Sequence, residues 1–208
     1  EISADAQVTT KLSKQSAKRQ RASLRQMKSD SIVLLLLAAG ESRRFGSEKL
    51  LADFAGKPIL QWSLDSFGTI DAMGKILVVN PDFEPEMFEI GSFQTVINEN
   101  YKDGISTSIV RGLRECPDSC EGIVLALADM PLITKEDVER LVGSVTTEDE
   151  MVSYVFEGKK GFPTYISRKV FSRLSRITGD RGAYQLVKSG LAKMREIIDS
   201  LAEREVIS

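Results

Sequence analysis

A basic loop containing glycine directly follows an apolar segment, and this combination can bind phosphate groups. Residues 32–38 are almost wholly aliphatic, as expected of a central strand that is buried on both faces. Gly40 and Gly46 let the following loop turn sharply and bring its backbone close to a ligand. Cationic side chains in and after this loop can donate hydrogen bonds to a polyphosphate, and they are Arg43, Arg44 and Lys49. The loop therefore predicts a nucleotide site.

A carboxylate at the end of a second apolar segment is the other candidate for chemistry. Residues 122–128 predict a strand, and Asp129-Met130-Pro131 follows it. In open α/β sheets the ligand lies outside the carboxyl ends of the strands, so Asp129 is expected to face the loop's ligand. A carboxylate there can hold Mg²⁺. The alternative is a turn or helix-capping role for Asp129.

Several other kinds of site are excluded by residue type or spacing. A Walker A loop ends in Gly-Lys-Ser/Thr, whereas Gly46 is followed by Ser47 and Glu48, and no G-x-G-x-x-G occurs. The chain contains no histidine, which removes Ser-His-Asp and Cys-His catalysis. Cys116 and Cys120 lack the second half of a four-ligand zinc site, so we expect ordinary thiols in a reducing cytoplasm.

The first motif also resembles the signature of a known family. The pattern L-A-A-G-x-S-x-R-[MF]-G-x-x-K is similar to that of nucleotidyltransferases related to molybdenum cofactor guanylyl- and cytidylyltransferases. The resemblance implies a Rossmann-like three-layer α/β/α fold with a mostly parallel sheet and a mixed edge. It implies Mg-dependent transfer of NMP from an NTP to molybdopterin, with release of pyrophosphate. The implied catalytic residues are Arg44, Lys49 and Asp129, with Asp129 as the metal ligand.

The resemblance extends to residues that would border the nucleotide. Gly104 can turn the chain before a helix, which leaves first-turn N–H groups and the hydroxyls of Ser106 and Ser108 for an anion. Asn80 resembles a base-contacting asparagine, although an Asx-turn suits it equally. The full predicted nucleotide-binding set is Leu37, Ala38, Ala39, Gly40, Glu41, Ser42, Gly46, Lys49, Asn80, Asn98, Gly104 and Ser108.

Acceptor and base are predicted from weaker matches. Gly161 and Pro163 lie in a G-x-P element, and Gly179 and Asp180 lie in a G-D-x-G-A segment, both similar to acceptor-binding parts of the family. A hairpin turn and a helix cap are the structural alternatives. Ala39 stands where the guanylyl branch more often has glycine, so the resemblance favours CTP, with its smaller pyrimidine base.

The chain also departs from the family pattern. Ala128 replaces the usual glycine before Asp129, Phe162 replaces a polar residue, and the C-terminal D-I-D-T-P-E-D segment is missing. Two alternatives therefore remain beside molybdopterin cytidylylation. One is nucleotidyl transfer to a sugar or another small phosphate, and the other is a catalytically silent homologue that binds nucleotide or cofactor.

Alternating element signals predict the scaffold that positions these residues. Thr134 and Asp137 resemble a capping pair, and Ser167 is a candidate N-cap. Expected strands are residues 75–79, 95–98, 122–128, 151–156 and 164–166. Expected helices are residues 59–67, 106–114, 135–143, 167–176, one starting near 183, and 191–206.

Charge is distributed unevenly along the 208 residues. Seven basic and three acidic residues before Ser31 give +4, which leaves −6 for the rest of a chain with net charge −2. We predict a basic extension over residues 1–31 and one nucleotidyltransferase domain over residues 32–208, and we expect removal of residues 1–28 to leave turnover unchanged. The expected partners are NTP, the phosphorylated acceptor and a molybdoenzyme or chaperone; neither membrane nor nucleic acid is expected.

Overall fold

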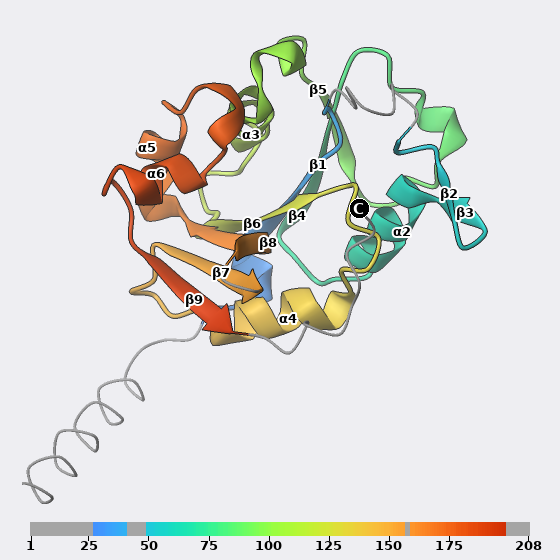
Figure 1. Ribbon diagram of the computed structural model, residues 1–208. Helices are drawn as coiled ribbons and strands as arrows, with labels where there is room; N and C mark the ends of the chain where they lie inside the picture. The colour runs from blue at the N-terminus through green and yellow to red at the C-terminus, as the bar shows by residue number, and fades with distance from the viewer. Residues whose placement is uncertain (1–26, 41–48, 157–158, 199–208) are drawn as a thin grey trace, which may run out of the picture.

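The computed structural model describes residues 27–40, 49–156 and 159–198. Within them, seven strands form one sheet in the order β5-β4-β1-β6-β8-β7-β9, and two short strands pair as a separate hairpin (Figure 1). The strands of the large sheet are β1 Ile32–Leu37, β4 Gly74–Val79, β5 Gln94–Ile97, β6 Gly122–Leu127, β7 Met151–Phe156, β8 Lys159–Ser167 and β9 Met194–Ile198; those of the hairpin are β2 Asp53–Phe54 and β3 Lys57–Pro58.

Most strands of the sheet run parallel. β1 pairs in parallel with β4 and β6, and β4 pairs in parallel with β5. β8 is antiparallel to both β6 and β7, while β9 is parallel to β7. The carboxyl ends of β1, β4, β5 and β6 therefore meet at one edge of the sheet. The predicted mostly parallel sheet with a mixed part is confirmed.

Helices cover both faces of the sheet, which gives three layers (Figure 1). Side chains of α2 and α4 pack in one hydrophobic core, and those of α3, α5 and α6 pack in the other. The helices are α2 Ile59–Gly68, α3 Ile105–Leu113, α4 Lys135–Ser144, α5 Phe171–Leu174 and α6 Tyr184–Lys188. Short 3-10 helices are η1 Ser29–Ser31, η3 Pro85–Met87, η4 Tyr101–Asp103, η5 Arg168–Val170 and η6 Gly179–Arg181.

The aliphatic run of β1 supplies both cores, because successive side chains of a strand point to opposite faces. Leu34 and Leu36 lie in the core on the α2 side, whereas Val33 and Leu35 lie in the core on the α3 side. All six residues of β1 are buried. The prediction of a central strand covered on both faces is confirmed.

Two of the predicted local signals differ in their outcome. Thr134 and Asp137 form a complete capping box at the start of α4, as predicted. Ser167 accepts a hydrogen bond from the Lys169 N–H, but it caps η5, and α5 after it has only four residues. The single helix expected over residues 167–176 is therefore wrong.

The helix expected over residues 191–206 is also wrong where the structure describes it. Residues 194–198 form β9, whose parallel pairing with β7 outweighs the helical spacing of apolar residues. The Arg195 guanidinium binds Asp149 at 2.9 Å, which fastens β9 to the loop before β7. Residues 199–206 lie outside the described residues.

Glu150 makes a further attachment of the segment that leads into β9. Its carboxylate accepts the Lys193 N–H at 2.7 Å and a guanidinium N–H of Arg173 at 2.8 Å. These donors, the Lys193 amide first, hold the pKa of Glu150 below its ordinary value. The carboxylate therefore stabilises the fold in its charged form.

The last residues before β1 pack against the domain. Met27 is buried in the core beside α4, and its N–H donates to the Val145 carbonyl at 3.1 Å. The Ser31 carbonyl accepts the Glu121 N–H at 2.8 Å. A deletion of residues 1–28 therefore removes a core side chain, so we expect a cost in stability, while the unchanged turnover stays a prediction. None of the helices in the described ranges is long and apolar enough to cross a membrane.

Candidate functional site

Lys49 and Asp129 meet in the structure, although 80 residues separate them in the chain. The Lys49 Nζ donates to the Asp129 Oδ2 at 2.8 Å. Asp129 follows β6, and β1, which precedes the loop leading to Lys49, is the neighbouring strand of the sheet. Their side chains are 38% and 35% exposed, so both charges can reach a ligand. The structure therefore brings two of the three predicted catalytic residues together at the carboxyl edge of the sheet, and their catalytic role stays a prediction.

The segment after Lys49 is fastened to α2. The carbonyls of Leu50 and Ala52 accept the N–H groups of Leu60 and Ile59, at 3.1 and 3.0 Å. First-turn N–H groups have no partner within their own helix, so these bonds also satisfy the start of α2. Lys49 is thus held only one residue away from a rigid element.

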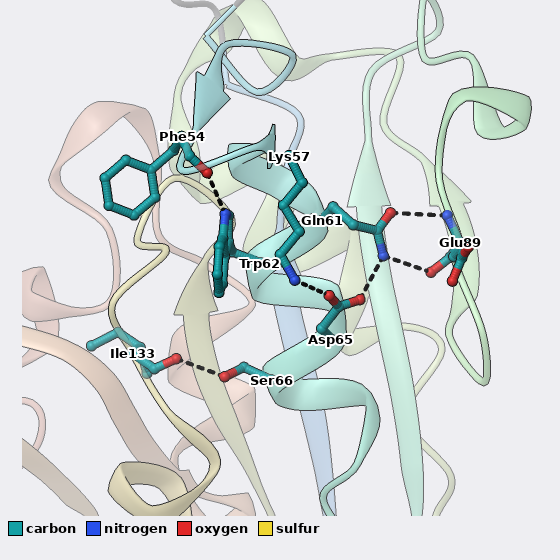
Figure 2. Close-up of polar contacts among 8 residues, drawn as sticks. All are labelled: Phe54, Lys57, Gln61, Trp62, Asp65, Ser66, Glu89 and Ile133. Carbon is teal, nitrogen blue, oxygen red and sulfur yellow. Dashed lines mark hydrogen bonds and ion pairs between the residues drawn. The ribbon is translucent and has the colours of Figure 1, made fainter.

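The hairpin of β2 and β3 packs on the same helix (Figure 2). The Trp62 indole N–H donates to the Phe54 carbonyl at 2.6 Å, and their rings pack edge to face with centroids 6.2 Å apart. The Lys57 ammonium lies 3.8 Å from the centre of the Trp62 ring and also binds Asp65. Gln61 joins Asp65 to the backbone of Glu89. The network ties this hairpin and the loop before β5 to α2.

The first motif is described only at its beginning and end. Leu37, Ala38 and Ala39 are buried, and Gly40 is exposed. Ala39 is 0% exposed and belongs to the core beside α3. Its methyl group therefore has no exposed surface with which to narrow a base pocket, and the CTP preference keeps only its support from the resemblance. The predicted residues Glu41, Ser42, Arg43, Arg44 and Gly46 lie outside the described residues.

Asn98 and Ser108 lie together in the interior. The Asn98 amide donates to the hydroxyls of Thr107 and Ser108, at 2.9 Å each, and its carbonyl oxygen accepts the Asn100 N–H at 3.1 Å. Ser106 and Ser108 are 1% and 5% exposed. The expectation that these two hydroxyls are open to an anion is therefore wrong, and Asn98 with Ser108 instead fixes the start of α3.

Gly104 brings predicted nucleotide and acceptor residues into direct contact. Its φ of 105° favours glycine, and it immediately precedes α3. A Cβ at this position would lie 2.5 Å from the Gly179 carbonyl carbon and 2.6 Å from the Asp180 Oδ1. Only the absence of a side chain permits this approach. Asp180 itself is exposed.

The other predicted contacts have local structural partners. The Asn80 side-chain oxygen accepts the Asp82 N–H at 3.0 Å, which is the Asx-turn alternative. The Gly161 carbonyl accepts the Ser153 hydroxyl at 2.7 Å, and Pro163 is buried. The antiparallel register of β8 on β6 places both residues toward the carboxyl edge. Their contacts with ligand stay predictions.

The donor set at Asp129 fits one metal ion in particular. Among the residues that the structure describes, no three His, Cys, Asp or Glu side chains group closely enough to hold a metal. Asp129 can offer one carboxylate to a metal ion. Mg²⁺ usually keeps several waters and takes phosphate oxygens of the substrate, so one carboxylate suits it when a triphosphate is bound.

Cys116 and Cys120 are free thiols, as expected.

Sequence reasoning missed the polar residues of α2 that support the site. Ser63 is completely buried, and its hydroxyl donates to the Ala128 carbonyl at 3.0 Å. Ser66 donates to the Ile133 carbonyl at 3.0 Å (Figure 2). The available signal was two serines three residues apart, and therefore on one face of the helix.

A mostly parallel α/β sheet with a lysine and a carboxylate at its carboxyl edge is an arrangement that can bind a metal-nucleotide ligand. The chain belongs to the family of MobA-like NTP transferase domains, whose model matches residues 34–196. It is therefore an NTP nucleotidyltransferase of this family, whose members use a divalent metal.

Relatives and solved structures agree with this assignment. The purine catabolism protein PucB of Bacillus subtilis is 29% identical over 79% of this chain and 84% of its own length. A probable molybdenum cofactor guanylyltransferase of Bacillus licheniformis is 27% identical over 60% of this chain and 62% of its own. The crystal structure of Rv0371c from Mycobacterium tuberculosis superposes with a TM-score of 0.73 and 26% identity, covering 83% and 89% of the two chains. Rv0371c is also known in complex with manganese, at a TM-score of 0.65 and 23% identity over the same shares.

Proposed function

We propose that this chain transfers CMP from CTP to a phosphorylated acceptor such as molybdopterin, with release of pyrophosphate. The observation that carries the proposal is the 2.8 Å contact between Lys49 and Asp129. An ammonium for phosphate oxygens and a carboxylate for a divalent cation are the two charges that a metal-triphosphate substrate requires. Both residues lie in motifs to which the family resemblance assigns these roles.

Nucleotidyl transfer asks the protein mainly for alignment and charge stabilisation. An oxygen of the acceptor phosphate attacks the α-phosphorus, a new P–O bond forms, and the bond to the β-phosphate oxygen breaks as pyrophosphate leaves. Lys49 would bind the triphosphate and stabilise the charge of the leaving group, together with Arg44. Asp129 would hold Mg²⁺, which neutralises phosphate charge when bound. No side-chain nucleophile is needed.

The Gly104 contact supports a shared site for nucleotide and acceptor. The turn at Gly104 leads into α3 on the nucleotide side, and η6 with Gly179 and Asp180 forms the proposed acceptor side. Because these two segments touch, the acceptor phosphate would enter beside the bound nucleotide. Gly161 and Pro163 would complete the acceptor side from β8.

The choice of CTP and of molybdopterin rests on the sequence resemblance. The relatives' names point to purine catabolism and to molybdenum cofactor guanylyl transfer, so GTP is the direct competitor of CTP. A sugar phosphate is the competing acceptor, since the chemistry would be the same.

Pyrophosphate release tests the proposal directly. The protein is incubated with Mg²⁺, with each NTP in turn, and with molybdopterin or a sugar phosphate. We expect pyrophosphate release to require an NTP, the metal and molybdopterin. When CTP and GTP compete in one assay, we expect CTP to be the preferred substrate. Release with GTP but with no other NTP would refute the predicted use of CTP. Release only with sugar phosphates would refute molybdopterin as the acceptor. Binding of NTP without release under any condition would identify a silent homologue.

A further inference from the structure

Helix α2 contacts the segments that carry both Lys49 and Asp129. On the lysine side, the backbone N–H groups of Ile59 and Leu60 hold the residues directly after Lys49. On the carboxylate side, two serine hydroxyls bind the loop of residues 128–133 at its first and last residues. One rigid element therefore connects the two charged groups of the proposed site.

The Ser63 hydrogen bond is unusual for a serine within a helix. Such hydroxyls commonly bind a carbonyl of the preceding helical turn, whereas the Ser63 hydroxyl reaches the Ala128 carbonyl, 65 residues away in the chain. Ser63 is 0% exposed and Ala128 is 1% exposed. Ala128 lies just beyond the end of β6, and the Ala128 N–H already donates to the Leu37 carbonyl of β1 at 3.0 Å. The bond to Ser63 therefore fixes the peptide that leads directly into Asp129.

Ser66 fixes the other end of the same loop. Its hydroxyl donates to the Ile133 carbonyl at 3.0 Å (Figure 2). Ser66 lies about one helical turn along α2 from Ser63. The Ile133 N–H in turn donates to the Met130 carbonyl at 3.2 Å, which closes the loop on itself. Asp129 thus lies in a short loop attached at both ends to α2.

We propose that Ser63 is a positioning residue of the nucleotidyl transfer, with Ser66 as a second attachment. By holding the loop of residues 128–133, Ser63 sets the place of the Asp129 carboxylate relative to Lys49. This inference rests on the proposed function, because it assigns the loop's geometry to metal and triphosphate binding. Hydrogen bonds behind metal ligands commonly change metal affinity by about 10- to 100-fold when they are removed.

Manganese binding to the full chain in the presence of an NTP and without acceptor tests the inference. Ser63→Ala should weaken Mn²⁺ binding in this complex by about tenfold, measured by electron paramagnetic resonance. Affinity for the NTP in EDTA should not change, because the Ser63 hydroxyl donates its hydrogen bond to the Asp129 loop. Ser66→Ala should also weaken Mn²⁺ binding. Because Ser66 is less buried than Ser63, this variant keeps the test informative if Ser63→Ala does not fold. Thermal unfolding verifies that each variant is folded.

Matched variants separate the hydrogen bond from volume and from general stability. Ser63→Thr keeps a hydroxyl donor and should retain Mn²⁺ affinity better than Ser63→Cys, which is a weak donor of similar size. Ser144→Ala removes a helical serine hydroxyl that binds the Leu141 carbonyl within α4. It should leave Mn²⁺ binding at the wild-type value.

The outcomes distinguish this inference from the proposed function. Wild-type Mn²⁺ affinity in Ser63→Ala and Ser66→Ala, beside a wild type that binds Mn²⁺ with NTP, would overturn the inference alone. Equal losses in Ser63→Ala and Ser144→Ala would also overturn it, since the effect would then be one of stability. A wild-type protein that binds no Mn²⁺ with any NTP would overturn the proposed function, and the inference with it.

Discussion

Substitution of Gly104 by alanine should separate the nucleotide side of the site from the acceptor side. The added Cβ would lie 2.5 Å from the Gly179 carbonyl carbon, whereas ordinary contact begins at 3.4 Å. Residues Gly179 and Asp180 must therefore move by about 1 Å, and a misplacement of that size can cost roughly 100-fold in rate. The backbone at φ 105° adds about 1–3 kcal/mol of strain for a residue with a side chain.

Strain and displacement can be separated with a matched glycine. Gly91 has φ 60°, and nothing lies within 4 Å of a Cβ built on it. Gly91→Ala should therefore lose about 1–3 kcal/mol of unfolding free energy in urea while pyrophosphate release stays at the wild-type rate. Gly104→Ala should lose at least as much stability, and its kcat/KM for the acceptor should fall by about 100-fold. Affinity for NTP should change less, because the displaced residues belong to the proposed acceptor side.

Two results would argue against a positioning role of the Gly104 contact. Gly104→Ala that keeps wild-type kcat/KM for the acceptor, while folded, would show that Gly179 and Asp180 do not position the acceptor. Equal losses of activity in Gly91→Ala and Gly104→Ala would assign the effect to backbone strain alone.

Further predictions concern the chain's beginning, an acid-sensitive contact and the lysine. Removal of residues 1–26 should leave pyrophosphate release unchanged. Removal of residues 1–28 should cost about 1–3 kcal/mol of unfolding free energy through the loss of the Met27 core side chain. Equal unfolding free energies of the two shortened proteins would contradict this. The folded-state pKa of Glu150 lies below its ordinary value of 4.5, so its contribution to stability is present above pH 4.5 and is lost as pH falls through the folded-state pKa. Glu150→Gln should accordingly flatten the acid side of the stability profile, and an unchanged profile would argue against it. Lys49→Ala should weaken binding of CTP more than that of CMP by calorimetry, and equal losses would remove the lysine from the β- and γ-phosphates.

The sheet and its carboxyl edge could be predicted because their signals are local. The aliphatic run of β1 and the Asp129 segment after β6 each require only strand patterning and the rule that ligands lie at strand ends. The capping box likewise depends on two residues close together in the sequence, Thr134 and Asp137. Elements stabilised by distant partners were not predictable in this way. β9 owes its strand conformation to pairing with β7 and to the Asp149 contact, which its own helical spacing does not indicate.

In the candidate site, too, features that follow from local motifs could be predicted, and features that depend on distant contacts could not. The pairing of Lys49 with Asp129 follows from two motifs whose strands are neighbours. The interior position of Ser108 does not, because whether a hydroxyl faces a ligand or the protein depends on how α3 packs. The roles of Ser63 and Gly104 depend on contacts with residues 65 and 75 positions away. Side-chain type and spacing alone could not predict those contacts.

The rate of NTP- and acceptor-dependent pyrophosphate release by Asp129→Asn shows whether the Asp129 carboxylate holds the metal ion for the transfer. The substitution keeps the shape of the side chain and removes the charge that would hold Mg²⁺ beside Lys49. The rate should fall by about 100- to 1,000-fold in a folded Asp129→Asn protein. Asp118 is an exposed carboxylate paired with Arg168 at 2.9 Å, and Asp118→Asn should remain at the wild-type rate. A folded Asp129→Asn variant that releases pyrophosphate at the wild-type rate would show that Asp129 does not hold the metal ion.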